Sequence, residues 1–187
     1  KGLSAVHYAH AGSGELHLRP ILNLKTEEGK TLFKSIAWDI AKLVKQYRGS
    51  LSGEHGDGRL RAEFIPYMIG DALYADLQWM KQLWDPKGIF NPNKIVNAPA
   101  MNEQLRYTPN QANNEPPNTF FDWSESGGFV RAAELCNGSA DCRKSEKIGG
   151  VMCPTYMATK DETQTTRARS NALREVYTNE YSSAASH

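Results

Sequence analysis

The feature that most constrains the fold is a glycine-rich turn between two short segments of alternating character. Residues 3–9, LSAVHYA, and 15–22, ELHLRPIL, alternate as strands do, and His10 and the turn AGSG lie between them. The turn can adopt positive φ at Gly12 and Gly14. We therefore predict a β-hairpin or a pair of neighbouring antiparallel strands.

Two longer segments have the periodicity of amphipathic helices. Apolar residues recur at helical spacing within 26–49, which predicts a helix over 27–48 that stops at Gly49. Residues 59–85 are predicted to be helical in two pieces, with a break near Gly70. The expected fold class is α+β, with a small antiparallel sheet covered on one face by the helices 27–48 and 59–85.

The composition changes after residue 98. Residues 99–118 are rich in Asn, Pro and Gln and poor in apolar side chains, which predicts an extended linker. The remaining residues, 119–187, contain all three cysteines and a polar helical stretch. We predict a first domain over 1–98 and a mainly helical segment over 119–187.

The charge balance and hydropathy exclude several classes of partner. The chain has 22 basic and 21 acidic residues, so no basic field favours nucleic acid. It contains no apolar run long enough for a membrane span and no signal peptide, and the expected location is cytoplasmic. Because the chain starts without methionine, we expect it to be a piece of a longer protein.

Candidate metal ligands bracket the first turn and recur in a later glycine-rich loop. His10 and His17 flank AGSG, and Glu54 lies in GEHGDG, residues 53–58. Imidazole nitrogens and a carboxylate oxygen are the ligand set of a catalytic divalent metal site with an open position. The alternative is that both histidines lie on a solvated sheet face.

Two other positions are candidates for chemistry. His55 suits a general base, because an imidazole has a pKa near the working pH; the alternative is an ordinary glycine-rich loop with a capping Glu. The turn NPNKI, residues 91–95, presents Asn91 and Lys94, and by itself it favours a purely structural turn.

Together the motifs HAGSGELH, GEHGDG and DPKGIFNPNKI resemble the C-terminal half of FAD-linked oxidases of the vanillyl-alcohol oxidase superfamily. The similar branch contains the D-2-hydroxyacid dehydrogenases of the D-lactate, glycolate and D-2-hydroxyglutarate types. The resemblance covers residues 3–97. The usual first motif is H-x-G-D-G-N-x-H, and here Ser13 and Glu15 replace its Asp and Asn.

The resemblance implies roles for named residues. His10, His17 and Glu54 would hold a divalent metal, zinc or manganese, that binds the 2-hydroxyl and carboxylate of the substrate. His55 would take the hydroxyl proton while the C2 hydride passes to the flavin. Asn91 would lie against the flavin or the substrate, and an upstream domain would bind most of the FAD.

Arg19 is a further candidate, on the strand that carries His17. In this strand His17 and Arg19 alternate with Leu16 and Leu18, so both polar side chains are expected on one face. A guanidinium matches a carboxylate bidentately, and Arg19 could therefore bind the substrate carboxylate. The alternative is a strand arginine on a solvated face.

The cysteines form an odd, clustered set, which is a poor disulfide framework and favours metal or cluster ligands. Cys136, Cys142 and Cys153 lie in a segment that resembles the iron–sulfur region following the flavin part in large bacterial fusion proteins, and Cys153-Pro154 is a ferredoxin-type ending. Ser139 occupies the middle position of the first cysteine run, and a second run is absent before His187. We expect no intact cluster in this chain; buried thiols in a helical subdomain, as a partial ferredoxin-type segment, are the favoured arrangement.

The predicted function is that of a piece of a flavin- and iron–sulfur-dependent D-2-hydroxyacid dehydrogenase. Electrons would pass from the 2-hydroxyacid to FAD, then to the clusters and to an external acceptor, through which the protein could associate peripherally with a membrane. The chain alone is expected to be inactive. The alternative is a non-redox metal-binding or interaction module with structural His and Cys residues.

Overall fold

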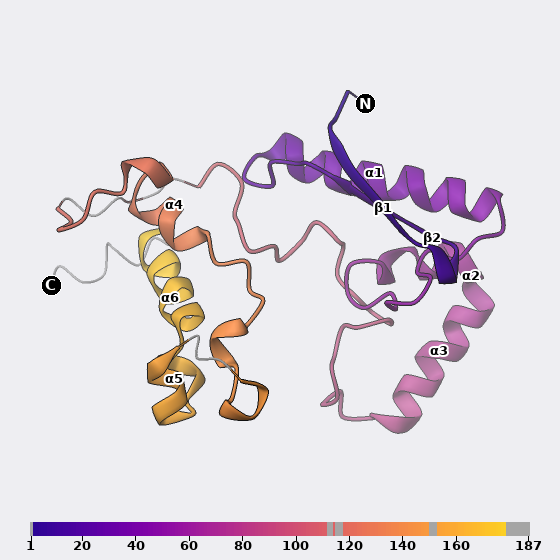
Figure 1. Ribbon diagram of the computed structural model, residues 1–187. Coiled ribbons are helices and arrows are strands. Elements are labelled where there is room, and N and C mark those ends of the chain that lie inside the picture. The colour runs from indigo at the N-terminus through magenta and orange to yellow at the C-terminus, as the bar shows by residue number, and fades with distance from the viewer. Residues whose placement is uncertain (1, 112–113, 115–117, 150–152, 179–187) are drawn as a thin grey trace, which may run out of the picture. The chain divides into compact units, whose positions relative to one another are not determined.

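The computed structural model describes residues 2–111, 114, 118–149 and 153–178, which form two compact units (Figure 1). The first unit comprises residues 1–110 and the second residues 111–187, and each is described by itself. In the described residues, no helix is both long and apolar enough to cross a membrane.

The first unit opens with the predicted antiparallel hairpin. Strand β1, Ala5–His10, pairs with β2, Glu15–Pro20, and a 3-10 turn, Ala11–Ser13, connects them. Gly14 closes the turn at φ 68°, a left-handed conformation that favours glycine. Gly12 lies inside the 3-10 turn and does not adopt positive φ.

The register divides the hairpin into a polar face and an apolar face. Tyr8 lies opposite His17, and His10 lies opposite Glu15, so these four side chains share one face. Leu16 and Leu18 project from the other face and are 78% and 46% exposed. The hairpin therefore presents its polar face to the rest of this unit.

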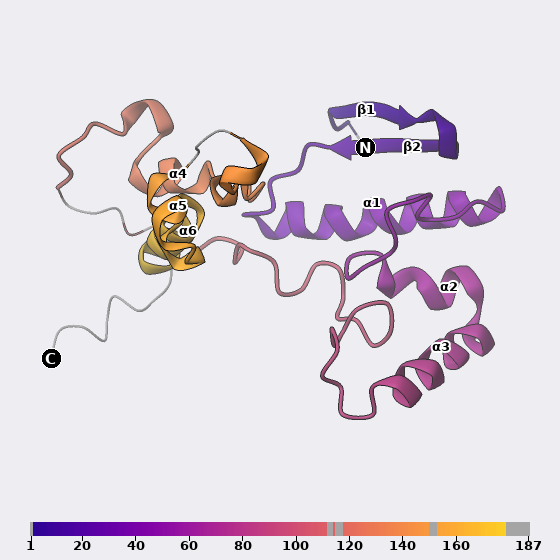
Figure 2. The ribbon, with the colours of Figure 1, turned by 60° about the horizontal axis from the view of Figure 1, so that its bottom comes forward.

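Helix α1, Glu27–Gln46, lies along the hairpin, and the other helices of this unit lie beyond it (Figure 2). Its first turn is capped by Thr26, whose hydroxyl accepts a hydrogen bond from the Gly29 N–H at 3.1 Å. A side chain at Gly29 would place Cβ 1.9 Å from the Asn23 carbonyl oxygen, so the cap requires glycine there. The helix predicted over 27–48 is confirmed, with its end two residues earlier.

The second helical segment is broken where the sequence predicts. A 3-10 turn, Ala62–Phe64, leads into α2, Ile65–Ile69, and α3, Asp71–Trp84, follows it. Gly70 separates α2 from α3 at φ 87°, which confirms the break. Residues 59–61 form a turn rather than the predicted helix.

The core of the first unit lies between α1 and the segments that follow it. Ala41, Phe64 and Met101 are buried and pack together, with Trp38 and Leu51 among the partly buried residues around them. Met101 lies within the segment 99–118 predicted as a linker, and the boundary between the two units lies at residue 110, inside that segment.

Glu63 joins three segments of this core. Its carboxylate accepts hydrogen bonds from Met101 N–H at 2.6 Å and Trp38 Nε1 at 3.3 Å, and it pairs with Lys34 Nζ at 2.8 Å. Partial burial raises the pKa of Glu63, but the hydrogen bonds from Lys34 and Met101 outweigh it and hold the pKa below its ordinary value.

This lowered pKa predicts a pH dependence of stability. A carboxylate with a depressed folded-state pKa stabilises the fold above its unfolded pKa, 4.5, and that stability is lost as the pH falls through the folded pKa. We expect Glu63→Gln to lower the free energy of unfolding by about 1–3 kcal/mol at pH 7, and by less at pH 3. Urea titrations at both pH values measure this, with Glu28→Gln on the exposed face of α1 as control. Equal losses at the two pH values would contradict the assignment.

The second unit is mainly helical. It contains α4, Phe129–Glu134, α5, Pro154–Thr159, and α6, Thr166–Thr178, joined by 3-10 turns. Helix α4 packs against α6, with Val130 fully buried and the Phe129 ring against Tyr177 at 5.3 Å between centroids.

Candidate metal centre

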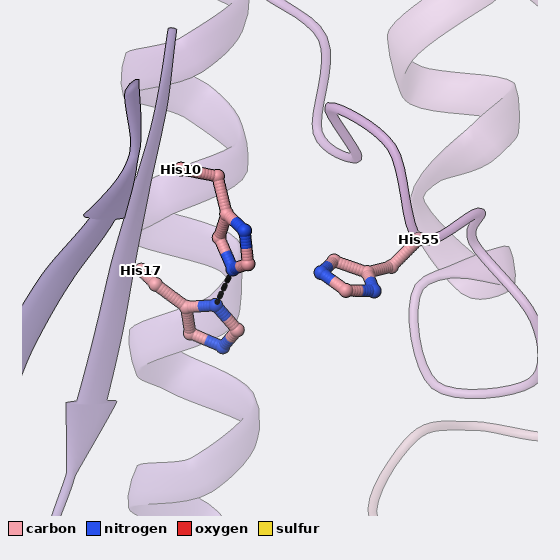
Figure 3. Close-up of side chains that lie close together, drawn as sticks. All are labelled: His10, His17 and His55. Atoms are coloured by element: carbon pink, nitrogen blue, oxygen red, sulfur yellow. Dashed lines mark hydrogen bonds between the residues drawn. The ribbon is translucent and has the colours of Figure 1, made fainter. Parts of the chain in front are cut away.

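Four polar side chains from two separate segments of the first unit converge at one end of the hairpin. His10 and His17 come from the strands and His55 comes from the loop after α1 (Figure 3), where Glu54 precedes it. His17 Nδ1 lies 3.4 Å from His10 Nε2, and His10 Nδ1 lies 2.8 Å from Glu54 Oε1. We call these four residues the candidate metal centre.

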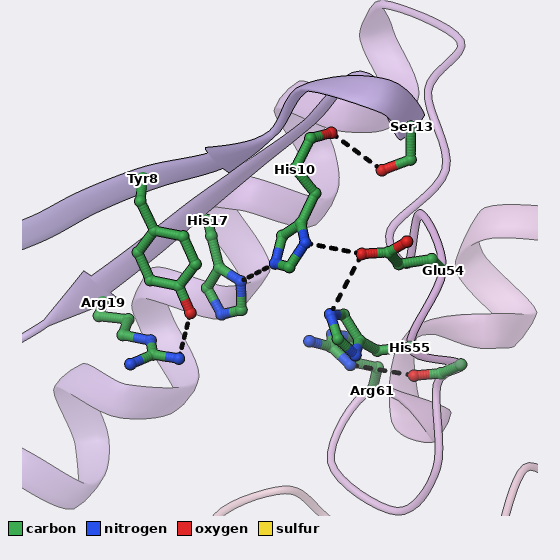
Figure 4. A network of polar contacts seen from close by, with 9 residues as sticks. Tyr8, His10, Ser13, His17, Arg19, Glu54, His55 and Arg61 are labelled. Atoms are coloured by element: carbon green, nitrogen blue, oxygen red, sulfur yellow. Dashed lines mark hydrogen bonds and ion pairs between the residues drawn. The ribbon is translucent and has the colours of Figure 1, made fainter.

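The hairpin register explains why the two strand histidines meet. His10 and His17 occupy the same face of neighbouring strands as a diagonal pair, within reach of aromatic side chains. The Ser13 hydroxyl donates a hydrogen bond to the His10 carbonyl oxygen at 3.0 Å, which ties down the turn (Figure 4). The turn thus positions both imidazoles toward the loop that carries Glu54 and His55.

The ligand atoms are close enough to share an ion. His10, His17 and His55 each offer a nitrogen, and these nitrogens lie within 4.8 Å of one another. A second group with the same spacing contains His10, Glu15, Glu54 and His55. Ligands at about 2.0–2.2 Å from one ion lie at most about 4.4 Å apart, so small side-chain rotations suffice.

The three predicted ligands lie close together, but His17 and Glu54 contact different nitrogens of the His10 ring. His10 presents Nε2 to His17 and Nδ1 to Glu54, so one ion bound by all three requires a rotation of an imidazole. His55, predicted as the general base, has Nε2 3.6 Å from Glu54 Oε1 and belongs to both ligand groups. His55 thus has the position of a ligand, and its role as the general base stays a prediction.

The local electrostatics favour a neutral imidazole at His17. Desolvation lowers its pKa most, and the positive charge of Arg19 and the neighbouring His10 and His55 lower the pKa further, while Glu15 opposes them. A neutral imidazole is the form that binds a metal ion.

Arg19 lies two residues after His17 in β2 and therefore projects from the same face of the hairpin. Its Nη2 donates a hydrogen bond to the Tyr8 hydroxyl, and its guanidinium lies 4.7 Å from the centre of the Tyr8 ring. Tyr8 in turn stacks on the His17 ring, with centroids 4.5 Å apart (Figure 4). The three side chains form a continuous stack that holds the exposed Arg19 beside the candidate metal centre.

Asn91 lies elsewhere in the first unit. It has φ 46° and lines a groove of about 510 Å³ between α3 and the turn after it, with Met80, Trp84 and Phe90. None of the side chains in the candidate metal centre lines this groove. Asp85 holds the turn in place, since its carboxylate accepts the N–H groups of Ile89 at 2.8 Å and Phe90 at 2.9 Å.

The three cysteines all lie in the second unit. Cys142 and Cys153 are buried and Cys136 is half-buried, and no disulfide joins them in the described part of the chain. Backbone hydrogen bonds from Tyr156 at the start of α5 are the largest cause of a lowered pKa at Cys153, against the effect of burial. Among the described residues, no group of three ligand atoms within 4.8 Å includes a cysteine.

Two residues of this site were missed as functional candidates from the sequence. Glu15 appeared only as a departure from the usual motif, and Tyr8 was not singled out. The strand register is the signal that finds them, because it pairs Glu15 with His10 and Tyr8 with His17.

Residues 1–95 match the model of the C-terminal domain of FAD linked oxidases, and the chain belongs to this family. A D-2-hydroxyglutarate dehydrogenase of Pseudomonas putida is 33% identical over 174 residues, which are 93% of this chain and 17% of that protein. The D-2-hydroxyglutarate dehydrogenase of Escherichia coli is 31% identical over 179 residues, with the same two coverages. A mitochondrial D-2-hydroxyglutarate dehydrogenase of Arabidopsis thaliana is 37% identical over 90 residues, 48% of this chain and 15% of that protein.

These matches confirm the predicted family, its α+β fold class and its link to FAD. The chain spans 17% of the length of the two bacterial relatives. Their alignments of 174 and 179 residues are longer than the first unit, so they extend into the cysteine-bearing second unit. No solved structure matches the chain.

Proposed function

We propose that this chain supplies the metal- and substrate-binding part of an FAD-linked D-2-hydroxyacid dehydrogenase. The observation that carries the proposal is the convergence of His10, His17, Glu54 and His55 in a member of the FAD linked oxidases. The names of the relatives favour D-2-hydroxyglutarate as the first substrate to test, ahead of D-lactate and glycolate.

The residues of the candidate metal centre have different roles in the proposed oxidation of the substrate alcohol. His10, His17 and Glu54 would hold the divalent ion, zinc or manganese, and their mixed nitrogen and oxygen donors suit either metal. When bound, FAD supplies the hydride acceptor, and the metal acts as a Lewis acid that lowers the pKa of the substrate hydroxyl. His55 accepts the hydroxyl proton, and the 2-hydroxyacid, having lost this proton and the C2 hydride, leaves as a 2-oxoacid.

The exposure of these side chains is consistent with such a role. The His10, Glu54 and His55 side chains are 34%, 45% and 50% exposed, so an ion and a small acid can reach them. Glu54 lies between His10 and His55, where its carboxylate can orient either ring (Figure 4). We propose that in the complete protein the groove lined by Asn91 lies against the flavin or the substrate.

We assign the second unit to onward electron transfer. In this proposal, Cys136, Cys142 and Cys153 would contribute ligands to an iron–sulfur cluster of the complete protein, and the cluster would supply one-electron transfer to an external acceptor. The support is the lowered pKa of Cys153, because the backbone N–H groups of Tyr156 and Thr166 around its sulfur favour a thiolate and outweigh the opposing effect of burial.

Expression of the complete reading frame that encodes this chain tests the proposal. The expected product is a yellow protein with a flavin absorption spectrum that reduces a dye in the presence of D-2-hydroxyglutarate or D-lactate. A colourless protein that still binds zinc would overturn the proposal and favour the non-redox metal-binding module.

Replacing Arg19 tests its proposed contact with the substrate carboxylate. In the complete protein, Arg19→Met should raise KM for the hydroxyacid about 10–100-fold and change kcat less, because a hydrogen bond to a charged group contributes about 1.5–3 kcal/mol. Steady-state kinetics measure this, with Arg48→Met, at an exposed position after α1, as the matched control. An unchanged KM would assign Arg19 to the solvated strand face.

A further inference from the structure

We propose that Glu15 is an additional ligand of the candidate metal centre and that its carboxylate biases the site toward a hard cation such as Mn²⁺. The inference rests on the proposed metal-binding function. The usual motif has Asn at this position, and Glu15 adds a carboxylate that belongs to this chain's own sequence.

The first observation is an unsatisfied oxygen. Glu15 Oε2 is buried from solvent and has no hydrogen-bond partner. A buried carboxylate oxygen without a donor is costly, because it loses its water and gains nothing in return. A cation bound at this point would compensate that loss.

The second observation is the position of Glu15 relative to the other ligands. Glu15 lies directly opposite His10 in the hairpin, and its carboxylate belongs to the group with His10, Glu54 and His55 whose ligand atoms lie within 4.8 Å of one another. Two carboxylates this close repel each other unless a positive charge lies between them. The arrangement therefore calls for a cation shared by Glu15 and Glu54.

The third observation is the space reserved for the Glu15 side chain. A Cβ at Gly53 would lie 3.0 Å from Glu15 Oε2 and 3.3 Å from Glu15 Cδ. Gly53 has an ordinary φ, so its backbone conformation does not require glycine. Its lack of a side chain instead lets the carboxylate lie between the strand and the loop that carries Glu54.

The second carboxylate predicts a change in metal preference. Carboxylate oxygens suit Mn²⁺, whereas imidazole nitrogens suit Zn²⁺. With Glu15 in place the site offers two carboxylates beside its imidazoles. Removing the Glu15 charge should therefore weaken Mn²⁺ binding more than Zn²⁺ binding.

Calorimetric titration of the chelator-stripped, purified 187-residue chain with MnCl₂ and with ZnCl₂ tests the inference. We expect Glu15→Gln to weaken Mn²⁺ binding by at least about 10–100-fold, because loss of a charged ligand costs no less than loss of a residue that supports a metal site, and to weaken Zn²⁺ binding less. Glu28→Gln, the same change on the exposed face of α1, should leave both affinities unchanged.

The outcomes separate the inference from the function on which it rests. If the unaltered chain binds neither metal, the metal centre itself is wrong. If it binds Mn²⁺ and Glu15→Gln binds Mn²⁺ equally well, Glu15 is not a ligand. If circular dichroism shows that Glu15→Gln is unfolded, Gly53→Ala carries the test: weakened Mn²⁺ binding supports the inference, and unchanged binding overturns it.

Discussion

Replacing His10 by alanine is expected to abolish zinc binding by this chain. His10 belongs to both groups of ligand atoms, and its two ring nitrogens lie 3.4 Å from His17 Nδ1 and 2.8 Å from Glu54 Oε1. Loss of a direct ligand should cost more than the roughly 10–100-fold that loss of a supporting residue costs. Zinc content after dialysis and a calorimetric titration measure the effect, and in the complete protein the proposed dehydrogenase activity should disappear with it.

The control for this experiment lies on the same strand. His7 is exposed, and it alternates with Tyr8 and therefore projects from the opposite face of the hairpin. His7→Ala removes the same chemical group and should leave zinc binding intact. An unchanged zinc affinity in His10→Ala would show that the ion is held elsewhere.

Replacing Phe64 by alanine should cause the largest loss of stability in the first unit. Phe64 is 1% exposed, packs with Ala41 and Met101, and contacts the Trp38 ring edge-on at 4.9 Å between centroids. Truncation of a buried Phe removes its apolar contacts and leaves a cavity, which costs about 3–5 kcal/mol. Urea denaturation followed by tryptophan fluorescence measures the free energy of unfolding.

Phe90→Ala serves as the matched control, because Phe90 lies in the same unit and is 68% exposed. It should lower the free energy of unfolding by less than about 1 kcal/mol. A loss of this small size in Phe64→Ala would mean that the core does not depend on this ring. Leu51 packs in the same core, so loss of Phe64 should also loosen the loop that carries Glu54 and His55.

The parts of the fold that could be predicted from the sequence are those set by local rules. Alternation and a short turn specify the hairpin, apolar periodicity specifies α1, and Gly70 breaks the second helical segment. The predicted helix begins too early, at residue 59, because the apolar periodicity continues upstream of α2. Pro66 marks the true start, since proline with its fixed φ is favoured in the first turn of a helix.

The candidate site could be predicted only in part, because some of its contacts depend on long-range structure. The order of the motifs identified His10, His17, Glu54 and His55, which the structure places in two overlapping groups of ligand atoms that share His10 and His55. Glu15 was missed as a ligand because its role depends on the strand register and on the space left by Gly53, two long-range properties.

The proposed metal ligands are divided between two segments that are distant in the chain, the hairpin and the loop after α1. An ion bound by His17 and Glu54 would thus act as a cross-link that closes a long loop, with a gain in stability set by its free concentration. The ion would then reinforce the contact between His10 and Glu54 that already joins the two segments. Metal supply would in this way set the rigidity of the substrate-binding strand as well as the acidity of the substrate hydroxyl.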